Sequence, residues 1–256
     1  GELFAQKGFR VSMVDIDQKA LIRSRRQIES KLRNRLFMVP SRISWSLDLY
    51  EAVKDVDLVV ETVTEDLNLK VRIFAQLDQS TPKHAILVSN SSTFPITWIV
   101  DKVSEERRPK CASLHFMNPV GASKIVEVVK GTYTSDETIQ VLEALVRKLG
   151  KKPIVLKKEA PGFIINRVLG AILRESYRLL EEGVASAEEI DEALKLGLWL
   201  PMGPFRLSDL IGIDVIYHSM KSTYDLFKLE YLRPPNFLKE MVERGELGMK
   251  TKKGFY

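Results

Sequence analysis

The sequence is poor in cysteine and has no long apolar run. Its one cysteine, Cys111, excludes a disulfide within the chain and fits a reducing compartment, so we expect a cytoplasmic protein. No apolar run approaches the roughly 18 residues that span a membrane as a helix. We therefore expect a soluble protein with no membrane partner, and we assign no residue to a metal site.

A glycine-rich G-x-G-x-x-G loop, which holds the pyrophosphate of a dinucleotide in many α/β proteins, is also missing. The first residues, ELFAQKG, have the pattern of a helix that stops at Gly8, and RVSMVDI then has the pattern of a β-strand. The chain thus begins inside a helix, and we expect further residues upstream of Gly1.

The net charge of the chain leaves several classes of ligand open. The net charge is +5, from 39 basic and 34 acidic residues, a bias that favours solubility or an anionic ligand. Basic residues crowd one predicted helix, at Arg23, Arg25, Arg26, Lys31, Arg33 and Arg35. We interpret this helix first as a solvated face and second as a surface for a phosphate-bearing small ligand. No nucleic-acid-binding motif accompanies it, so nucleic acid is not an expected partner.

The pattern of the chain changes near residue 160. Before it, helical patterns alternate with short β-branched runs, which are RVSMVDI, DLVVETV, AILVSN, KCASLHF, KIVEVV and KPIVLK. This alternation predicts an α/β fold with a parallel or mixed sheet covered by helices. After APGF at residues 160–163 only long amphipathic patterns follow. We predict an α/β domain over residues 1–159 and an all-helical domain over residues 160–256.

Capping-box patterns predict where two of the helices begin. Thr134 with Glu137 opens a helix over residues 134–149 that Gly150 stops. Ser186 with Glu189 opens a second helix, which we expect to end at Gly197.

Several polar residues follow predicted strands, where open α/β sheets bind their ligands. Asp15 ends the first strand, and from the residues alone we interpret it first as a turn former and second as an acidic side chain that binds a ribose. Glu65 and Lys70 follow the second strand. The third strand is followed by Asn90 and the Ser91–Thr93 cluster, which we interpret first as a helix cap and second as a ligand contact.

His115 differs from the two other histidines, His84 and His218, which we expect near the surface. It ends a strand and is followed by Asn-Pro. If that strand pairs antiparallel with KIVEVV about a turn centred on Gly121, His115 faces Glu127. A histidine held by a carboxylate can act as a general base, or the pair can be structural, and the residues alone leave both open.

The motifs LHFMNPVGASKIVEVV, SNSSTFPIT, EAPGFIINR, LGLWLPMGPFRLSDLIGID and KTKKGFY together resemble the L-3-hydroxyacyl-CoA dehydrogenase family, which includes 3-hydroxybutyryl-CoA dehydrogenases. The resemblance extends from Glu2 to Tyr256. It implies a Rossmann-like domain, whose first strand and glycine loop are missing here, and a helical domain that binds substrate and forms a homodimer. It also implies NAD as cofactor and oxidation of (S)-3-hydroxyacyl-CoA to 3-ketoacyl-CoA, in fatty-acid or hydroxybutyryl-CoA metabolism.

The resemblance also implies roles for individual residues. His115 matches the catalytic histidine of the family's HFFNP motif, in which Met117 replaces the second phenylalanine, and Glu127 matches its partner. Ser92 matches a serine that touches substrate and cofactor, and Asn166 matches an asparagine of the catalytic site. The implied cofactor contacts are Asp15, Glu65, Lys70, Ser92, Asn118 and Lys250, and the implied CoA contacts are Arg23, Lys31 and Arg35. The alternatives are a related dehydrogenase of free sugar acids and a crystallin-like, non-catalytic relative.

Overall fold

The computed structural model describes residues 1–32 and 40–256. The chain forms two compact units, Gly1–Ala160 and Pro161–Tyr256, each with its own hydrophobic core. Within the described ranges, no helix is both long enough and apolar enough to cross a membrane.

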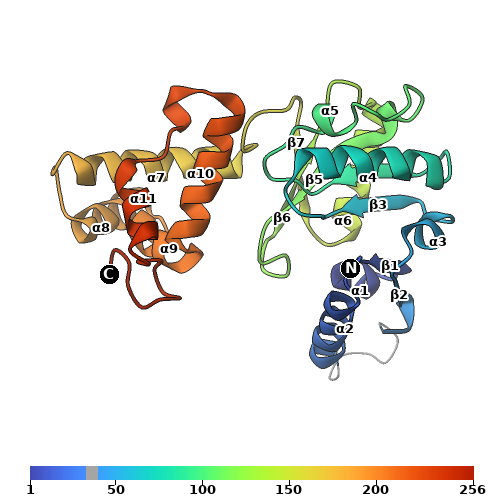
Figure 1. Cartoon of the computed structure of the whole chain (residues 1–256), viewed down its shortest axis with the longest axis horizontal. Coiled ribbons are helices and arrows are strands. Elements are labelled where there is room, and N and C mark those ends of the chain that lie inside the picture. Colours follow the sequence, from blue (N-terminus) through green and yellow to red (C-terminus); the bar gives the residue numbers. More distant parts are fainter. Residues whose placement is uncertain (33–39) are drawn as a thin grey trace. The chain divides into compact units, whose positions relative to one another are not determined.

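The first unit contains two sheets (Figure 1). Strands β1 (Val11–Val14) and β2 (Ile43–Ser46) pair in parallel. The larger sheet runs in the order β3 (Leu58–Glu61), β4 (Ile86–Ser89), β5 (Cys111–Phe116), β6 (Ile125–Val129) and β7 (Lys152–Leu156). Its neighbouring strands are parallel except β5 and β6, which are antiparallel. The expected mixed, mostly parallel sheet is confirmed, although the four-residue strand β2 was not predicted.

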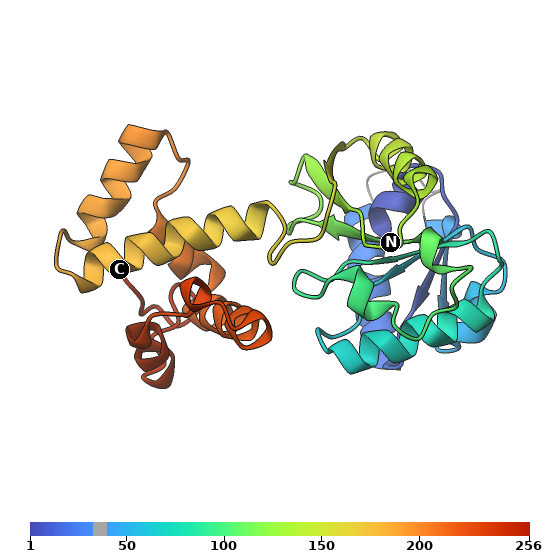
Figure 2. The same ribbon diagram turned by 90° about the horizontal axis from the view of Figure 1, so that it is seen from above.

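Helices cover both faces of the larger sheet. The first unit contains the helices α1 (Glu2–Gln6), α2 (Gln18–Leu32), α3 (Leu49–Val53), α4 (Leu67–Ser80), α5 (Ile96–Ile99) and α6 (Asp136–Lys148) and the 3-10 turns η1 (Pro40–Arg42) and η2 (Arg108–Lys110). Because side chains alternate along a strand, Leu87 packs with α3, α4 and α5 on one face. Its neighbour Val88 packs with α6 on the other. Figure 2 shows α4 and α6 on opposite sides of the strands.

The start of α6 differs from the prediction. Ser135, not Thr134, is the N-cap, and its side chain accepts a hydrogen bond from Thr138 N. Thr134 instead donates its hydroxyl to the Cys111 carbonyl at 2.6 Å and accepts from Gly131 N. The buried hydroxyl of Thr134 therefore joins the loop to β5, which a local capping pattern cannot reveal.

The second unit is helical, as expected. It contains α7 (Ile165–Glu181), α8 (Ala187–Leu198), α9 (Pro204–Ile211), α10 (Ile213–Phe227), η3 (Glu230–Leu232) and α11 (Asn236–Glu243). The capping box of Ser186 and Glu189 is confirmed at the start of α8. The predicted stop at Gly197 is wrong, because α8 continues to Leu198 and the left-handed cap is Trp199.

An aromatic cluster forms the centre of the second unit. Tyr177 of α7 stacks on Phe255 with ring centroids 5.8 Å apart and meets Phe205 edge-to-face. Its hydroxyl hydrogen-bonds to Ser208 at 2.6 Å. The last residues of the chain thus pack into the core of this unit.

Candidate functional site

The carboxyl ends of β3, β4 and β5 meet at one edge of the larger sheet. Glu61 and Ser89 are the last residues of β3 and β4 and face each other in the strand register. Asn90, the next residue, accepts a hydrogen bond from Phe116 N at the end of β5, at 2.9 Å. Polar side chains from three strands therefore gather where α/β sheets bind ligands.

His115 lies buried at this edge between a carboxylate and a hydroxyl. The predicted register is confirmed, because His115 on β5 pairs with Glu127 on β6. His115 Nδ1 lies 2.8 Å from Glu127 Oε2, and Nε2 lies 2.8 Å from Ser92 Oγ. The exposed fractions of His115 and Glu127 are 2% and 0%.

This geometry fixes the tautomer of the ring. A carboxylate can only accept, so the hydrogen of the neutral ring lies on Nδ1, and Nε2 carries the lone pair that accepts. Ser92 donates its hydroxyl to that lone pair. Nε2 is therefore the ring atom that can take a proton from a bound alcohol, and Glu127 stabilises the imidazolium that results.

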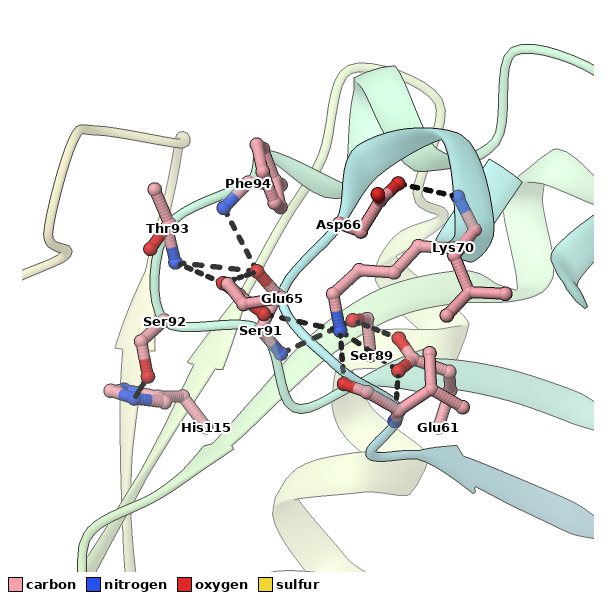
Figure 3. A network of polar contacts seen from close by, with 12 residues as sticks. Glu61, Glu65, Asp66, Lys70, Ser89, Ser91, Ser92, Thr93, Phe94 and His115 are labelled. Carbon is pink, nitrogen blue, oxygen red and sulfur yellow. Dashed lines mark hydrogen bonds and ion pairs between the residues drawn. The ribbon is translucent and has the colours of Figure 1, made fainter. Parts of the chain in front are cut away.

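A second polar network lies beside the histidine (Figure 3). Lys70, on the first turns of α4, bonds to Glu61 at 2.9 Å and to the Val63 carbonyl at 3.1 Å. It also forms an ion pair with Glu65 at 3.2 Å. The side chains of Lys70 and Glu61 are each 1% exposed, whereas that of Glu65 is 39% exposed. The predicted residues Glu65 and Lys70 thus contact each other at the sheet edge.

The serine cluster belongs to this network. Ser91 donates to Glu65 Oε1 at 2.5 Å, and the same oxygen accepts from Thr93 N at 3.0 Å. The favoured reading of the cluster as a helix cap is wrong, because α5 has Pro95 at its N-cap and no side-chain cap bond. The serines instead fix the loop that carries Ser92.

Asp15 and the basic helix lie by the smaller sheet. Asp15 directly follows β1, is exposed and accepts a hydrogen bond from Asp17 N at 2.9 Å. Arg23 of α2 is exposed and 3.5 Å from Asp17. Lys31 is in the last turn of α2, and Arg35 lies outside the described residues.

Three other predicted residues are Asn118, Asn166 and Lys250. Asn118 is exposed two residues after β5. Asn166, in the first turn of α7, and Lys250 belong to the second unit. Lys250 donates to Asp214, and this hydrogen bond holds the pKa of Asp214 below its usual value.

The sequence analysis did not predict Glu61 or Ser89 as part of the site. It named Ser91 but did not predict its bond to Glu65. Glu61 and Ser89 close the apolar runs LVVE and ILVS and are fully buried. A carboxylate in a buried strand is costly unless it is paired. A glutamate at the end of the apolar run LVVE was therefore the sequence feature that could have indicated a paired, buried Glu61.

A doubly wound α/β unit with a buried His–Glu pair at its sheet edge, together with a helical unit, defines a two-domain dehydrogenase of the Rossmann type. Residues 1–160 match the 3-hydroxyacyl-CoA dehydrogenase NAD-binding domain, and residues 162–256 match the C-terminal domain of the same family. The chain therefore belongs to the 3-hydroxyacyl-CoA dehydrogenase family and is an NAD-dependent oxidoreductase.

Similar proteins agree with this assignment. The chain is 37% identical over 276 residues to pig mitochondrial hydroxyacyl-coenzyme A dehydrogenase, covering 100% of this chain and 85% of the relative. It is 42% identical over 208 residues to 3-hydroxybutyryl-CoA dehydrogenase of Clostridioides difficile, covering 81% and 73%. The structure of (S)-3-hydroxybutyryl-CoA dehydrogenase from Ralstonia eutropha superimposes with a TM-score of 0.90 at 37% identity, covering 100% and 92%.

The residues at the end of β1 fit NAD. Asp15 presents an exposed carboxylate directly after a parallel strand, where an acidic side chain can accept hydrogen bonds from ribose hydroxyls. The same charge would repel the 2′-phosphate of NADP, and no arginine follows it immediately.

Proposed function

We propose that the protein catalyses the reversible oxidation of (S)-3-hydroxyacyl-CoA to 3-ketoacyl-CoA with His115 as general base and acid. The observation that carries this proposal is the buried contact of His115 with both Glu127 and Ser92, each at 2.8 Å. The names of the relatives support the CoA ester as substrate. The buried pair favours a working site over a non-catalytic relative, and the basic helix α2 favours a CoA ester over a free sugar acid.

In oxidation, Nε2 of His115 accepts the proton of the substrate's 3-hydroxyl, and Glu127 stabilises the imidazolium. Ser92, already within hydrogen-bond distance of Nε2, holds the substrate oxygen beside the ring. Bound NAD would supply the acceptor for the hydride that leaves C3. In reduction the imidazolium returns the proton. Positioning of this kind supplies much of the rate in two-substrate reactions.

The remaining assignments follow the same proposal. Residues 1–159 form the NAD-binding domain, with cofactor contacts from Asp15, Glu65, Lys70, Ser92 and Asn118, and Lys250 adds a cofactor contact from residues 160–256. Residues 160–256 form the substrate-binding and dimerisation domain, in which Asn166 holds the substrate. Arg23, Lys31 and Arg35 contact CoA. Exposed apolar side chains of the second unit, including Trp199 at 88%, support a homodimer. We place the reaction in fatty-acid or hydroxybutyryl-CoA metabolism in the cytoplasm, and the single thiol supports a reducing compartment.

A spectrophotometric assay tests the proposal. Purified protein is incubated with NADH and acetoacetyl-CoA, and with longer 3-ketoacyl-CoAs, and loss of absorbance at the NADH band is followed. We expect turnover with CoA esters, little with free acetoacetate, and less with NADPH than with NADH. Equal rates with the free acid would contradict the CoA assignment, and no turnover with any ester would contradict the reaction.

A further inference from the structure

Glu61 is a fully buried carboxylate that stands on β3, separated from the strand of His115 only by β4. We propose that Glu61 is a positioning residue that acts through Lys70 and Glu65 to fix Ser92 against His115. Its effect on turnover rests on the function proposed above, whereas its effect on the geometry of His115 does not.

Glu61 connects two elements at the sheet edge. Its Oε1 accepts from Lys70 Nζ at 2.9 Å and from Val63 N at 2.7 Å, and its Oε2 accepts from Ser89 Oγ at 2.6 Å. Ser89 Oγ in turn accepts from Ser91 N at 3.2 Å. One carboxylate thus joins the end of β4 and the start of α4 (Figure 3).

Lys70 connects Glu61 to Glu65. An ammonium group has three hydrogens, and Lys70 has three partners, Glu61, the Val63 carbonyl and Glu65, at 2.9, 3.1 and 3.2 Å. The ammonium is therefore saturated by the protein itself. A direct bond from Lys70 to a ligand requires the release of one partner, so its geometry fits a support better than a contact.

Glu65 then holds the residues on both sides of Ser92. Its Oε1 accepts from Ser91 Oγ and from Thr93 N. Ser91 Oγ also accepts from Phe94 N at 2.9 Å, which closes the turn. Ser92 lies between these fixed points, and its hydroxyl lies 2.8 Å from His115 Nε2.

The charge of Glu61 determines how strongly Lys70 attracts Glu65. Lys70 shares its positive charge between Glu61, which is buried, and Glu65, which is partly exposed. If Glu61 becomes neutral, Glu65 is the remaining carboxylate bonded to the buried ammonium. Glu65 is then drawn toward Lys70 and away from Ser91 and Thr93, which loosens the loop of Ser92.

The test compares Glu61→Gln with two reference variants. Ser92→Ala removes the histidine contact directly. Asp78→Asn is the matched control, because Asp78 also lies on α4 and pairs with a buried cation, Arg107, at 3.3 Å. Its carboxylate accepts hydrogen bonds from Ser104 and Arg107, which lie outside the loop of Ser92. Both Glu61→Gln and Asp78→Asn exchange a carboxylate for an amide of equal size.

Two readouts are measured on purified protein. In ligand-free protein labelled with ¹⁵N-histidine, His115 is distinguishable from His84 and His218, which are exposed. We expect Glu61→Gln to move the His115 ring signals in the direction of Ser92→Ala and to leave the other two unchanged. With acetoacetyl-CoA and NADH we expect kcat to fall by up to about 100-fold, with a smaller change in KM. Asp78→Asn should change neither readout.

A Glu61→Gln protein with unchanged His115 signals and normal kcat would overturn the proposal. If Glu61→Gln does not fold, Ser89→Ala takes its place, since it removes one bond to Glu61 without uncovering a buried charge; unchanged signals there overturn the proposal equally. If the wild type shows no dehydrogenase activity but Glu61→Gln still moves the His115 signals, the proposed function fails and the positioning role stands.

Discussion

At the scale of single residues, the proposed reaction depends on one imidazole with a different partner on each nitrogen. Glu127 accepts from Nδ1, and Ser92 donates to Nε2. Ser92 is uncharged, and its hydroxyl hydrogen has only to turn away from Nε2 for that nitrogen to accept a proton from another hydroxyl. The orientation of the ring is set before substrate binds.

His115→Gln tests this assignment. The amide can occupy the space of the ring but cannot take up a proton, so we expect kcat to fall by about 100- to 10,000-fold. Circular dichroism and the unfolding midpoint should show that the fold is retained. His84→Gln is the control, because His84 is exposed and pairs with Asp57 at the surface. Normal turnover in the His115 variant would remove the proposed base.

Ser113, unlike His115, is a buried polar residue whose side chain lacks a hydrogen-bond partner among the described residues. Its hydroxyl is fully buried on β5. Removal of an unsatisfied buried group is close to neutral or stabilising. We therefore expect the unfolding free energy of Ser113→Ala to lie within about 1 kcal/mol of the wild type or above it. A larger loss in denaturant titration would mean that the hydroxyl has a partner such as a bound water.

At the scale of elements, buried ion pairs hold α4 near both of its ends, one to strand β3 and one to Arg107, the N-cap residue of η2. Lys70 bonds to Glu61 near its start, and Asp78 bonds to Arg107 near its end. Arg107 also donates to the carbonyls of Pro82 and Ala85, which connect α4 to β4. The helix that carries Lys70 is therefore held in place independently of any ligand.

The Asp78 pair predicts an acid-sensitive part of the stability. Burial alone would raise the pKa of Asp78, but hydrogen bonds from Ser104 and Arg107 outweigh it and lower the pKa. A lowered pKa contributes stability above the unfolded value of about 3.9, and this contribution is lost as pH falls through the folded value. We expect Asp78→Asn to cost about 3 kcal/mol at pH 7 and progressively less below about pH 4. Denaturant titrations across pH measure both, and a constant difference down to pH 2 would contradict the sign.

At the scale of the whole molecule, the chain has two units with separate cores. The second unit is closed by the C-terminal residues, because Asp209 accepts from Phe255 N and Tyr256 N at 3.0 and 3.1 Å. Gly254 makes this closure possible. A Cβ at that position would lie 2.0 Å from Asp209 Oδ1.

Gly254→Ala should therefore destabilise the second unit. Overpacking of this kind costs about 1–3 kcal/mol, and we expect the loss to appear in α9 and the tail. Hydrogen exchange measured by mass spectrometry locates it. Gly197→Ala is the control for a crowding effect, because Gly197 lies within α8 of the same unit and a Cβ there meets nothing within 4 Å. Loss of protection in β3–β7 of Gly254→Ala would contradict the independence of the two cores.

Much of the fold followed from local pattern. Six strand segments were predicted correctly, because β-branched runs between turn signals identify strands wherever they lie. The strand β2 was missed because ISWS is short and mixes serines with its apolar residues. The capping box predicted at Ser186 is confirmed. The one predicted at Thr134 is wrong, because the hydroxyl of Thr134 bonds to the distant strand β5.

The sequence by itself determined the family, the alternation of elements and the pairing of His115 with Glu127. Antiparallel strands joined by a short connection have a register that the position of the turn sets. Only the tertiary structure decided that Glu61, Lys70, Glu65 and Ser91 form one network beside that pair. Ser91 and Glu65 are 26 residues apart, and Ser89 and Glu61 are 28 apart. Parallel strands meet through a crossover helix, and no turn in the sequence sets their register.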